Sequence, residues 1–178
     1  MTTGDETRIE TADVLDADPP GFTKAEAEEI AARHFDLVGR ASALASERDQ
    51  NFLIEDDSGG RAVLKISSAA EQTAVIEMEV AAALHAKRAD PELPIALPWP
   101  VRGHTRGGSF LAEDYHVSAE GDAGARHRVR MYDFMDGEAS ADSLSLDQDG
   151  LWEFGRVLAR LGRALRGFFH PAAGRVLL

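Results

Sequence analysis

Apolar and polar positions alternate on either side of a polar turn within residues 46–67, and this pattern predicts a β-hairpin. The strands are expected at Asn51–Ile54 and Arg61–Ile66, joined by Asp56–Gly60, whose residue types tolerate the positive φ of tight turns. Because successive side chains of a strand point to opposite faces, Lys65 should lie on the face opposite to Leu64. Lys65 then has two interpretations: an edge-strand lysine that discourages aggregation, or an ammonium group held on an ordered sheet face.

Apolar residues at steps of three and four predict three helices. The first runs from Thr23, which opens the capping box T-K-A-E, to about His34, the second covers Ala69–Arg88, and the third covers Asp147–Phe169. The apolar stripe of the third helix consists of Leu151, Phe154, Leu158, Leu161, Leu165 and Phe168. Such a stripe requires a partner surface, which is the first domain, a second copy of the chain, or a surface beyond the C-terminus. Four arginines fall largely off the stripe and are expected in solvent: Arg156, Arg160, Arg163 and Arg166.

Three further segments complete the predicted sheet. Phe35–Leu44 is expected as the first strand, with Gly39 as the site of a bulge. Val101–Glu120 reads as strand, turn and strand, Ala119–Ala125 as a loop, and Arg128–Met135 as the last strand. Four or five antiparallel strands with one long inserted helix indicate an α+β domain.

Composition narrows the class of protein. Hydrophobic residues make up 44% and charged residues 28% of the 178 residues, which is typical of a globular domain. The net charge of −12 argues against binding to nucleic acid or to anionic membranes. The absence of cysteine excludes disulfides and thiolate sites, and no apolar run is long enough to span a bilayer, so the cytoplasm is the expected location. Residues 1–21 are acidic and end in D-P-P-G, which predicts a disordered leader.

The candidate chemistry centres on Lys65. A lysine that holds phosphates needs a carboxylate to orient it, and the following helix offers Glu77 and Glu79, which cannot both face the sheet. The loop Ser46–Asn51 should lie above the same face, where its backbone N–H groups and hydroxyl could cover an anion, although it contains no glycine. The six histidines show no metal-ligand spacing, and no G-x-S-x-G nucleophile motif is present. The arginines around His127 are expected to be solvated.

Several motifs in order carry a resemblance to a known family. They are the loop S-E-R-D-Q-N-F, the strand V-L-K-I, the glutamate-bearing helix, an L-P-x-x-x-P segment and a strand ending in D-G. This order resembles the N-terminal lobe of the aminoglycoside phosphotransferase and choline kinase-like family, which is protein kinase-like. The run A-S-A-L-A-S-E-R-D-Q-N-F is most similar to the hydroxylysine kinase-like branch. The likeness covers roughly Thr23–Leu178.

The resemblance implies a fold and a ligand. The fold would be a protein kinase-like N-lobe of about five antiparallel strands with one long packed helix, an N-terminal helix, and one C-terminal helix from the start of a second lobe. The ligand would be ATP, with GTP as an alternative, together with Mg²⁺ whose ligands are expected outside this chain. A small-molecule acceptor would be the second substrate. The implied divisions are a leader at 1–21, the N-lobe at 22–137, a linker at 138–146 and the first helix of a truncated C-lobe at 147–178.

Individual residues take roles from the resemblance. Lys65 would contact the α- and β-phosphates and Glu77 would pair with it, with Glu79 as the alternative. The nucleotide-covering loop would be formed by Ser46, Arg48, Asp49, Gln50 and Asn51. Asp133 and Met135 would belong to a hinge that offers its backbone to adenine, with Tyr132 at the back of the pocket.

The catalytic part of the family pattern is missing from the 178 residues. Phosphoryl transfer needs an aspartate that orients the acceptor hydroxyl and further ligands for magnesium. In the family these come from an H-x-D-x-x-x-x-N loop, which this sequence does not contain. The resemblance therefore implies an ATP-binding lobe that is inactive alone. The alternative is a non-catalytic binding or regulatory module that dimerises through the Leu151–Phe168 stripe.

Overall fold

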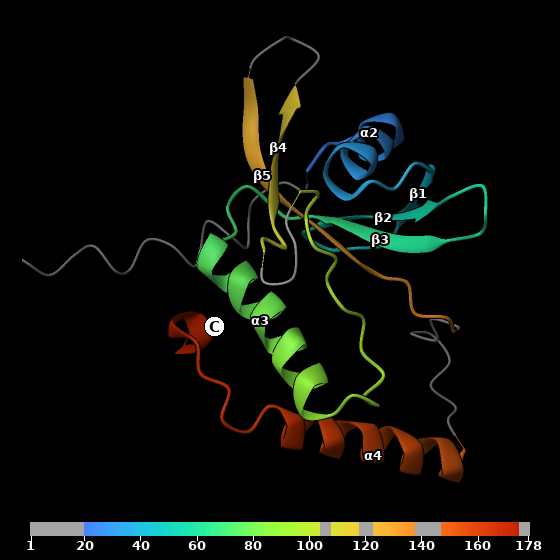
Figure 1. Cartoon of the computed structure of the whole chain (residues 1–178), viewed down its shortest axis with the longest axis vertical. Helices are drawn as coiled ribbons and strands as arrows, with labels where there is room; N and C mark the ends of the chain where they lie inside the picture. The colour runs from blue at the N-terminus through green and yellow to red at the C-terminus, as the bar shows by residue number, and fades with distance from the viewer. Residues whose placement is uncertain (1–19, 104–107, 118–122, 138–146, 175–178) are drawn as a thin grey trace, which may run out of the picture.

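A computed structural model of the chain describes residues 20–103, 108–117, 123–137 and 147–174. Within these residues five strands form one antiparallel sheet in the order β1-β2-β3-β5-β4 (Figure 1). The strands are β1 (Arg40–Leu44), β2 (Gln50–Glu55), β3 (Arg61–Ile66), β4 (Ala112–Val117) and β5 (Ala123–Asp133). Together with three helices they confirm the predicted α+β class.

Strand β3 is the central strand of the sheet, and this decides between the two interpretations of Lys65. In the antiparallel register Lys65 lies opposite Asn51 of β2 and Arg130 of β5. The edge-strand interpretation of Lys65 is therefore wrong. The hairpin forms as predicted, and Gly59 in its turn has a φ of 85°.

Helix α2 (Lys24–Phe35) covers one face of the sheet through an apolar core. Its N-terminus carries the predicted capping box, with Glu26 bonded to the Thr23 backbone and the Thr23 hydroxyl bonded to Glu26 N–H. The largest fully buried members of this core include Ile30, Phe52, Ile54, Leu64, Ile66, Val129 and Met131. The alternation of β3 is as predicted, since Leu64 faces this core and Lys65 does not.

The first predicted strand is too long. Phe35 belongs to α2 and is buried in the core, and β1 begins only at Arg40. Gly39 forms no bulge: it stands just before β1, where a Cβ atom would lie 2.5 Å from the carbonyl oxygen of Glu55. The sheet irregularity lies instead between Tyr115 and Val117 of β4.

Helix α3 (Thr73–Ala89) serves the opposite face of the sheet, below the strands in Figure 1. It starts four residues later than the prediction from Ala69. Two of its contacts with β5 are polar: Arg128 Nε donates to the Thr73 hydroxyl at 2.9 Å, and Arg130 binds Glu79. Arginines of β5 therefore bind α3 on this face of the sheet, whereas α2 packs on the other face through the apolar core.

The predicted strands between residues 101 and 135 need correction. Val101 and its described neighbours form no strand; Pro98 makes a single bridge to Tyr132, and Val101 N–H donates to Ser109. Strand β5 begins at Ala123, so the predicted loop is too long, and it ends at Asp133, so Met135 follows the strand. Residues 1–19 of the predicted leader at 1–21, the segments 104–107 and 118–122, and the predicted linker at 138–146 lie outside the described residues.

Helix α4 (Gln148–Ala164) packs against the C-terminal end of α3. Leu161 and Leu165 of the stripe pack on Ala86 and Leu93, and Arg160 forms a two-pronged ion pair with Asp90 at 2.7 and 2.8 Å. The prediction that Arg160 is solvated is therefore wrong. The helix also ends earlier than predicted, since Gly167 has a φ of 78° and a short 3₁₀ helix η1 (Pro171–Gly174) follows.

The N-terminal part of the stripe has no cover among the described residues. Four large apolar side chains of α4 are each more than half exposed: Leu151, Trp152, Phe154 and Leu158. The prediction that this stripe requires a further partner surface is therefore consistent with the fold.

We predict that Gly39→Ala destabilises the fold by about 1–3 kcal/mol, because the added Cβ must displace the Glu55 carbonyl. The matched control is Gly155→Ala in α4, where nothing lies within 4 Å of the new Cβ and helix propensity should add stability of up to about 1 kcal/mol. Urea unfolding of both variants measures the difference. Equal stability of the two variants would contradict the close approach of Gly39 to β2.

Candidate functional site

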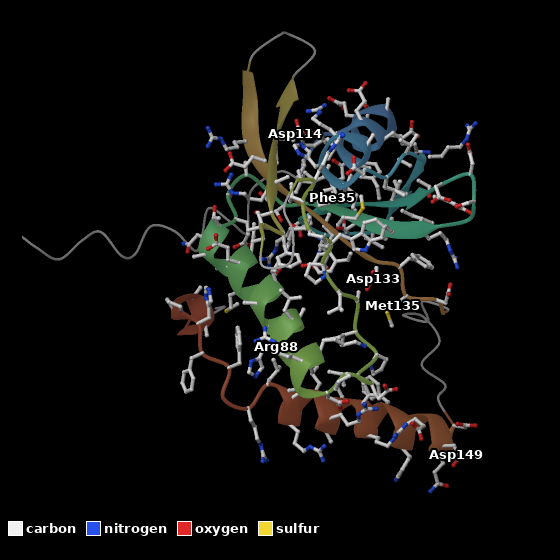
Figure 2. All side chains as sticks on the ribbon, viewed as in Figure 1. Phe35, Arg88, Asp114, Asp133, Met135 and Asp149 are labelled. Carbon is white, nitrogen blue, oxygen red and sulfur yellow. The ribbon has the colours of Figure 1, made fainter. Side chains whose placement is uncertain are left out.

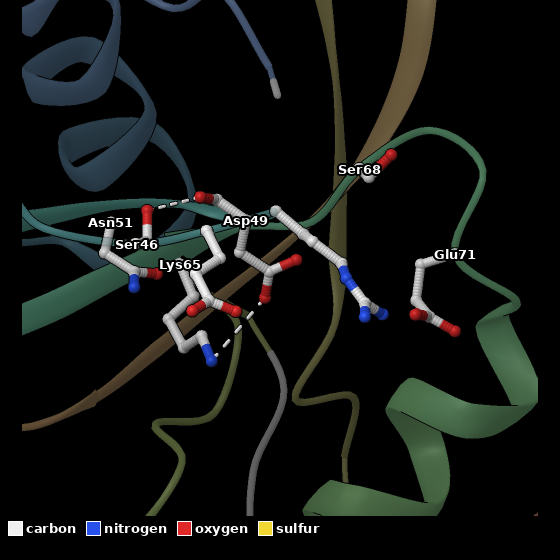
Figure 3. A pocket seen from close by; sticks show the side chains of 8 residues that line it. Ser46, Asp49, Asn51, Lys65, Ser68 and Glu71 are labelled. Atoms are coloured by element: carbon white, nitrogen blue, oxygen red, sulfur yellow. Dashed lines mark hydrogen bonds and ion pairs between the residues drawn. The ribbon is translucent and has the colours of Figure 1, made fainter. Parts of the chain in front are cut away.

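Lys65 lies at the junction of two hollows on the face of the sheet that α2 leaves uncovered. The first is a polar pocket of about 380 Å³, lined by Ser46, Glu47, Arg48, Asp49, Asn51, Lys65, Ser68 and Glu71 (Figure 3). The second, of about 410 Å³, is lined by Val63, Lys65, Ala96, Tyr132, Asp133, Phe134 and Met135. Lys65 is common to both linings.

The loop between β1 and β2 forms one wall of the polar pocket. The Ser46 hydroxyl donates to the backbone carbonyl of Asp49, which closes the loop on itself. The Asp49 carboxylate then lies 3.5 Å from the ammonium nitrogen of Lys65 (Figure 3). Asn51 adds a buried Oδ1 atom that has no hydrogen-bond partner within the described part of the chain. The loop therefore lies over Lys65, where the sequence placed it.

Gln50 is the exception in this loop. Its side chain accepts from the backbone N–H of Phe22 at 2.9 Å and donates to the Phe22 carbonyl at 2.7 Å. Gln50 therefore anchors the residue before α2 and does not line the polar pocket.

The predicted ion pair between Lys65 and Glu77 is not formed. Glu77 is exposed on α3 and makes no ion pair with another described residue, and the partner of Lys65 is Asp49. The carboxylate of α3 that reaches the sheet is the alternative, Glu79, but it binds Arg130 at 2.5 Å instead of Lys65. The reason is the register, which places Arg130 beside Lys65 and between the sheet and α3.

Arg130 is the residue of this site that the sequence did not reveal. Its side chain is 2% exposed, and its guanidinium contacts Glu79 Oε2 at 2.5 Å, the Ser67 hydroxyl at 2.9 Å and Asp49 Oδ2 at 3.4 Å. Burial opposes the charge, but the negative groups around Arg130, among them Glu79 and Asp49, outweigh burial and raise the pKa of Arg130. Arg130 therefore carries a permanent buried charge.

The prediction that the arginines around His127 are solvated is wrong for Arg130. Arg130 is buried, and so is His127, whose Nδ1 lies 2.8 Å from the Ser67 carbonyl oxygen. The signal in the sequence was the alternation of Val129 and Met131 with the arginines. This alternation places the arginines on the same face of the sheet as Lys65, but it does not indicate which arginine α3 covers.

Asp133 organises the second pocket through its own contacts. Its backbone N–H donates to the Leu97 carbonyl at 3.0 Å, and its carboxylate accepts from the Trp99 indole at 2.8 Å and from Leu97 N–H at 3.2 Å. The N–H of Asp133 is therefore already bonded within the chain, and the other backbone groups of the predicted hinge follow it. Figure 2 labels Asp133 and Met135 where the chain leaves β5.

The residues after Asp133 are held by β3. The guanidinium of Arg61 lies 4.5 Å from the centre of the Phe134 ring and forms an ion pair with Asp136 at 2.5 Å. Tyr132 is half-buried in the same pocket, and Met135 lies exposed at its rim. The apolar surface of the second pocket is thus formed by Tyr132, Phe134 and Met135 together with Val63 and Ala96.

Metal ligands and membrane spans were both sought in the described residues. No three His, Asp or Glu side chains there come together in a way that could hold a metal ion. No helix among those residues has the length and apolar character needed to cross a membrane.

The model of the phosphotransferase enzyme family matches residues 40–176, which include both pockets and α4. The chain belongs to the phosphotransferase enzyme family. The resemblance inferred from the S-E-R-D-Q-N-F loop and Lys65 is therefore confirmed at the level of the family. A comparison with curated proteins gave no match.

Two solved structures show that the family fold is present. A microcompartment-associated aminopropanol kinase is 20% identical and superposes over 85% of this chain with a TM-score of 0.59. An amicoumacin kinase in complex with AMP-PNP, Ca²⁺ and Ami is 13% identical over 84% of this chain, with a TM-score of 0.57. The chain spans 44% and 42% of these two structures, respectively. The predicted protein kinase-like N-lobe fold is confirmed.

We predict that Tyr132 makes stability fall above about pH 10, the ordinary pKa of tyrosine. Burial raises the pKa of Tyr132, although Arg130 opposes this effect. The folded state therefore retains a proton that the unfolded state loses, so the stabilisation is complete below about pH 10 and is lost as the pH rises toward the raised pKa. Urea unfolding between pH 8 and 11 measures the slope, and Tyr132→Phe should remove this component. The same dependence of stability on pH in the unmodified chain and in Tyr132→Phe would contradict the raised pKa of Tyr132.

Proposed function

We propose that this chain is the nucleotide-binding N-lobe of a small-molecule kinase. The reaction would transfer the γ-phosphoryl group of ATP, or of GTP as the alternative, to a hydroxyl of an amino-alcohol, aminoglycoside or hydroxylysine-like acceptor. The observation that carries the proposal is the position of Lys65, which lines a polar pocket and a partly apolar pocket at once. A nucleotide needs both environments, an anion site for its phosphates and a flat apolar surface for its base.

The proposal gives each wall of the site a role. Lys65 would hold the phosphates, and the loop with Ser46, Arg48, Asp49 and Asn51 would cover them. The base would lie against Tyr132, Phe134 and Met135, where Arg61 holds the Phe134 ring in place. Because the Asp133 N–H is already bonded, hydrogen bonds to the base would come from backbone groups after Asp133.

Two parts of the reaction would come from residues other than those described. Magnesium is expected with the nucleotide, yet the described residues gather no metal-binding set, so no step is assigned to the metal. The sequence also lacks the H-x-D-x-x-x-x-N motif, whose aspartate would orient the acceptor hydroxyl. We therefore expect no turnover by the 178 residues alone.

A cytoplasmic location is part of the same proposal. An amino-alcohol acceptor is supported by the likeness to an aminopropanol kinase.

We predict that ATP with Mg²⁺ binds in calorimetry and that Lys65→Met weakens the affinity at least about tenfold, as expected for loss of a charged contact to phosphate. Lys87→Met is the matched control, because Lys87 donates to the Leu93 carbonyl away from both pockets. The titration should use the 178 residues and any longer translated form of the gene. Absence of ATP binding in the longer form, or equal effects of the two lysine variants, would refute the nucleotide site.

A second candidate function is favoured by the exposed face of α4. Leu151, Phe154 and Leu158 lie on one stripe and are each more than half exposed. In the kinase proposal this surface would be covered by the remainder of a second lobe. In the second candidate the chain is a non-catalytic module that dimerises through α4.

Sedimentation equilibrium separates the two candidates. The second predicts a dimer that Phe154→Lys converts to a monomer, because a charge would be buried in an apolar contact. Glu153→Lys is the control, since it also adds positive charge to α4 but lies off the stripe, where it pairs with Arg156. A monomeric chain at concentrations near 100 µM, roughly the weak end of specific dimers, would exclude the dimerising module.

A further inference from the structure

One carboxylate oxygen lies between two cations at the edge of the polar pocket. Asp49 Oδ2 is 3.5 Å from Lys65 Nζ and 3.4 Å from Arg130 Nη2. Lys65 and Arg130 are register partners on the central strands, so their side chains emerge next to each other on the same face. Asp49 is therefore shared, and neither cation holds it alone.

The two cations differ in how they are held. The Lys65 side chain is 33% exposed and lines the pocket, whereas the Arg130 side chain is 2% exposed and does not line it. Arg130 is fixed from behind by Glu79 of α3 and by the Ser67 hydroxyl. Lys65 can therefore exchange the Asp49 carboxylate for another anion. Arg130 cannot move away without leaving the negative charges of Glu79 and Asp49 without the cation that lies between them.

A phosphate bound to Lys65 would face Asp49 at close range. Two like charges that share one cation repel each other, and the repulsion is strong in a partly buried pocket. A second, permanent cation beside Asp49 offsets this repulsion without touching the ligand. Arg130 is the cation in that position.

Resting on the nucleotide site proposed above, we propose that Arg130 is a positioning residue for phosphate binding. It keeps Asp49 and the loop between β1 and β2 in place while Lys65 exchanges the Asp49 carboxylate for a phosphate oxygen. Asp49 is then a competitor of phosphate for Lys65, and Arg130 is the residue that weakens this competition. The proposal predicts opposite effects for removal of the two groups.

The experiment is a double-mutant cycle with inorganic pyrophosphate as the probe in calorimetry, on the full 178-residue chain. Asp49→Asn should bind pyrophosphate about tenfold more tightly than the unmodified chain, and Arg130→Met about tenfold more weakly. The combined variant should bind about as tightly as Asp49→Asn, roughly tenfold more tightly than the unmodified chain, because without the carboxylate the guanidinium has nothing to offset. Arg130→Lys, which retains the charge, should lose less affinity than Arg130→Met.

Arg128→Met is the matched control. It removes an arginine from the same strand and face, but its partners are Thr73 and Glu113, away from the polar pocket. Its pyrophosphate affinity should be unchanged. Thermal unfolding of every variant accompanies the titrations, and Asp49→Asn alone decides the competition should Arg130→Met fail to fold.

The outcomes separate the positioning role from the nucleotide proposal. Weaker binding by Asp49→Asn would overturn the positioning role even if ATP binds. So would a combined variant that returns to the affinity of the unmodified chain, because that additive result means that Arg130 does not act through Asp49. Binding of pyrophosphate without binding of ATP would overturn the nucleotide function, and the cycle would still decide the role of Arg130. An unmodified chain that binds neither ligand would overturn both.

Discussion

The buried guanidinium of Arg130 is the constraint around which the side of the sheet with the two pockets is built. A charge that is removed from water is tolerated only when it is paired and hydrogen-bonded. Arg130 meets this condition through Glu79, Asp49 and Ser67, which belong to a helix, a loop and the end of a strand. Each of these three segments is thereby fixed relative to β5. The shape of the pocket around Lys65 follows from that arrangement.

The two faces of the sheet differ in polarity. On the α2 side, Ile30, Leu64 and Met131 belong to one apolar core. On the other side, Lys65, Arg130 and Tyr132 alternate with those core residues and remain polar. Strand alternation alone produces this division, because every second residue of β3 and β5 enters the core. A rigid apolar layer thus supports a polar one whose charges can exchange partners.

The sequence predicted what depends on local pattern and missed what depends on register. The capping box at Thr23, the hairpin with Gly59 and the strand Arg61–Ile66 each arise from neighbouring residues, and all three were predicted correctly. The partner of Lys65 depends on which residue of β5 lies beside it, and no local signal encodes that distance of 65 positions along the chain. The same applies to Arg160, whose partner Asp90 lies 70 residues away. The strand expected at Val101 does not form. The segment before it makes one isolated bridge, between Pro98 and Tyr132, instead of a ladder of paired residues.

Helix α3 is fastened at two points that belong to different parts of the molecule. Arg130 holds Glu79 in its first half, and Arg160 of α4 holds Asp90 just after its last residue. Eleven residues separate the two carboxylates, or about 16 Å along a helix axis, and an α-helix of that length is stiff. A displacement of α4 would therefore be transmitted through α3 to Glu79 and Arg130, at the edge of the polar pocket. A surface that binds the exposed face of α4 would in this way be connected, through α3 and Arg130, to Asp49, the carboxylate beside Lys65.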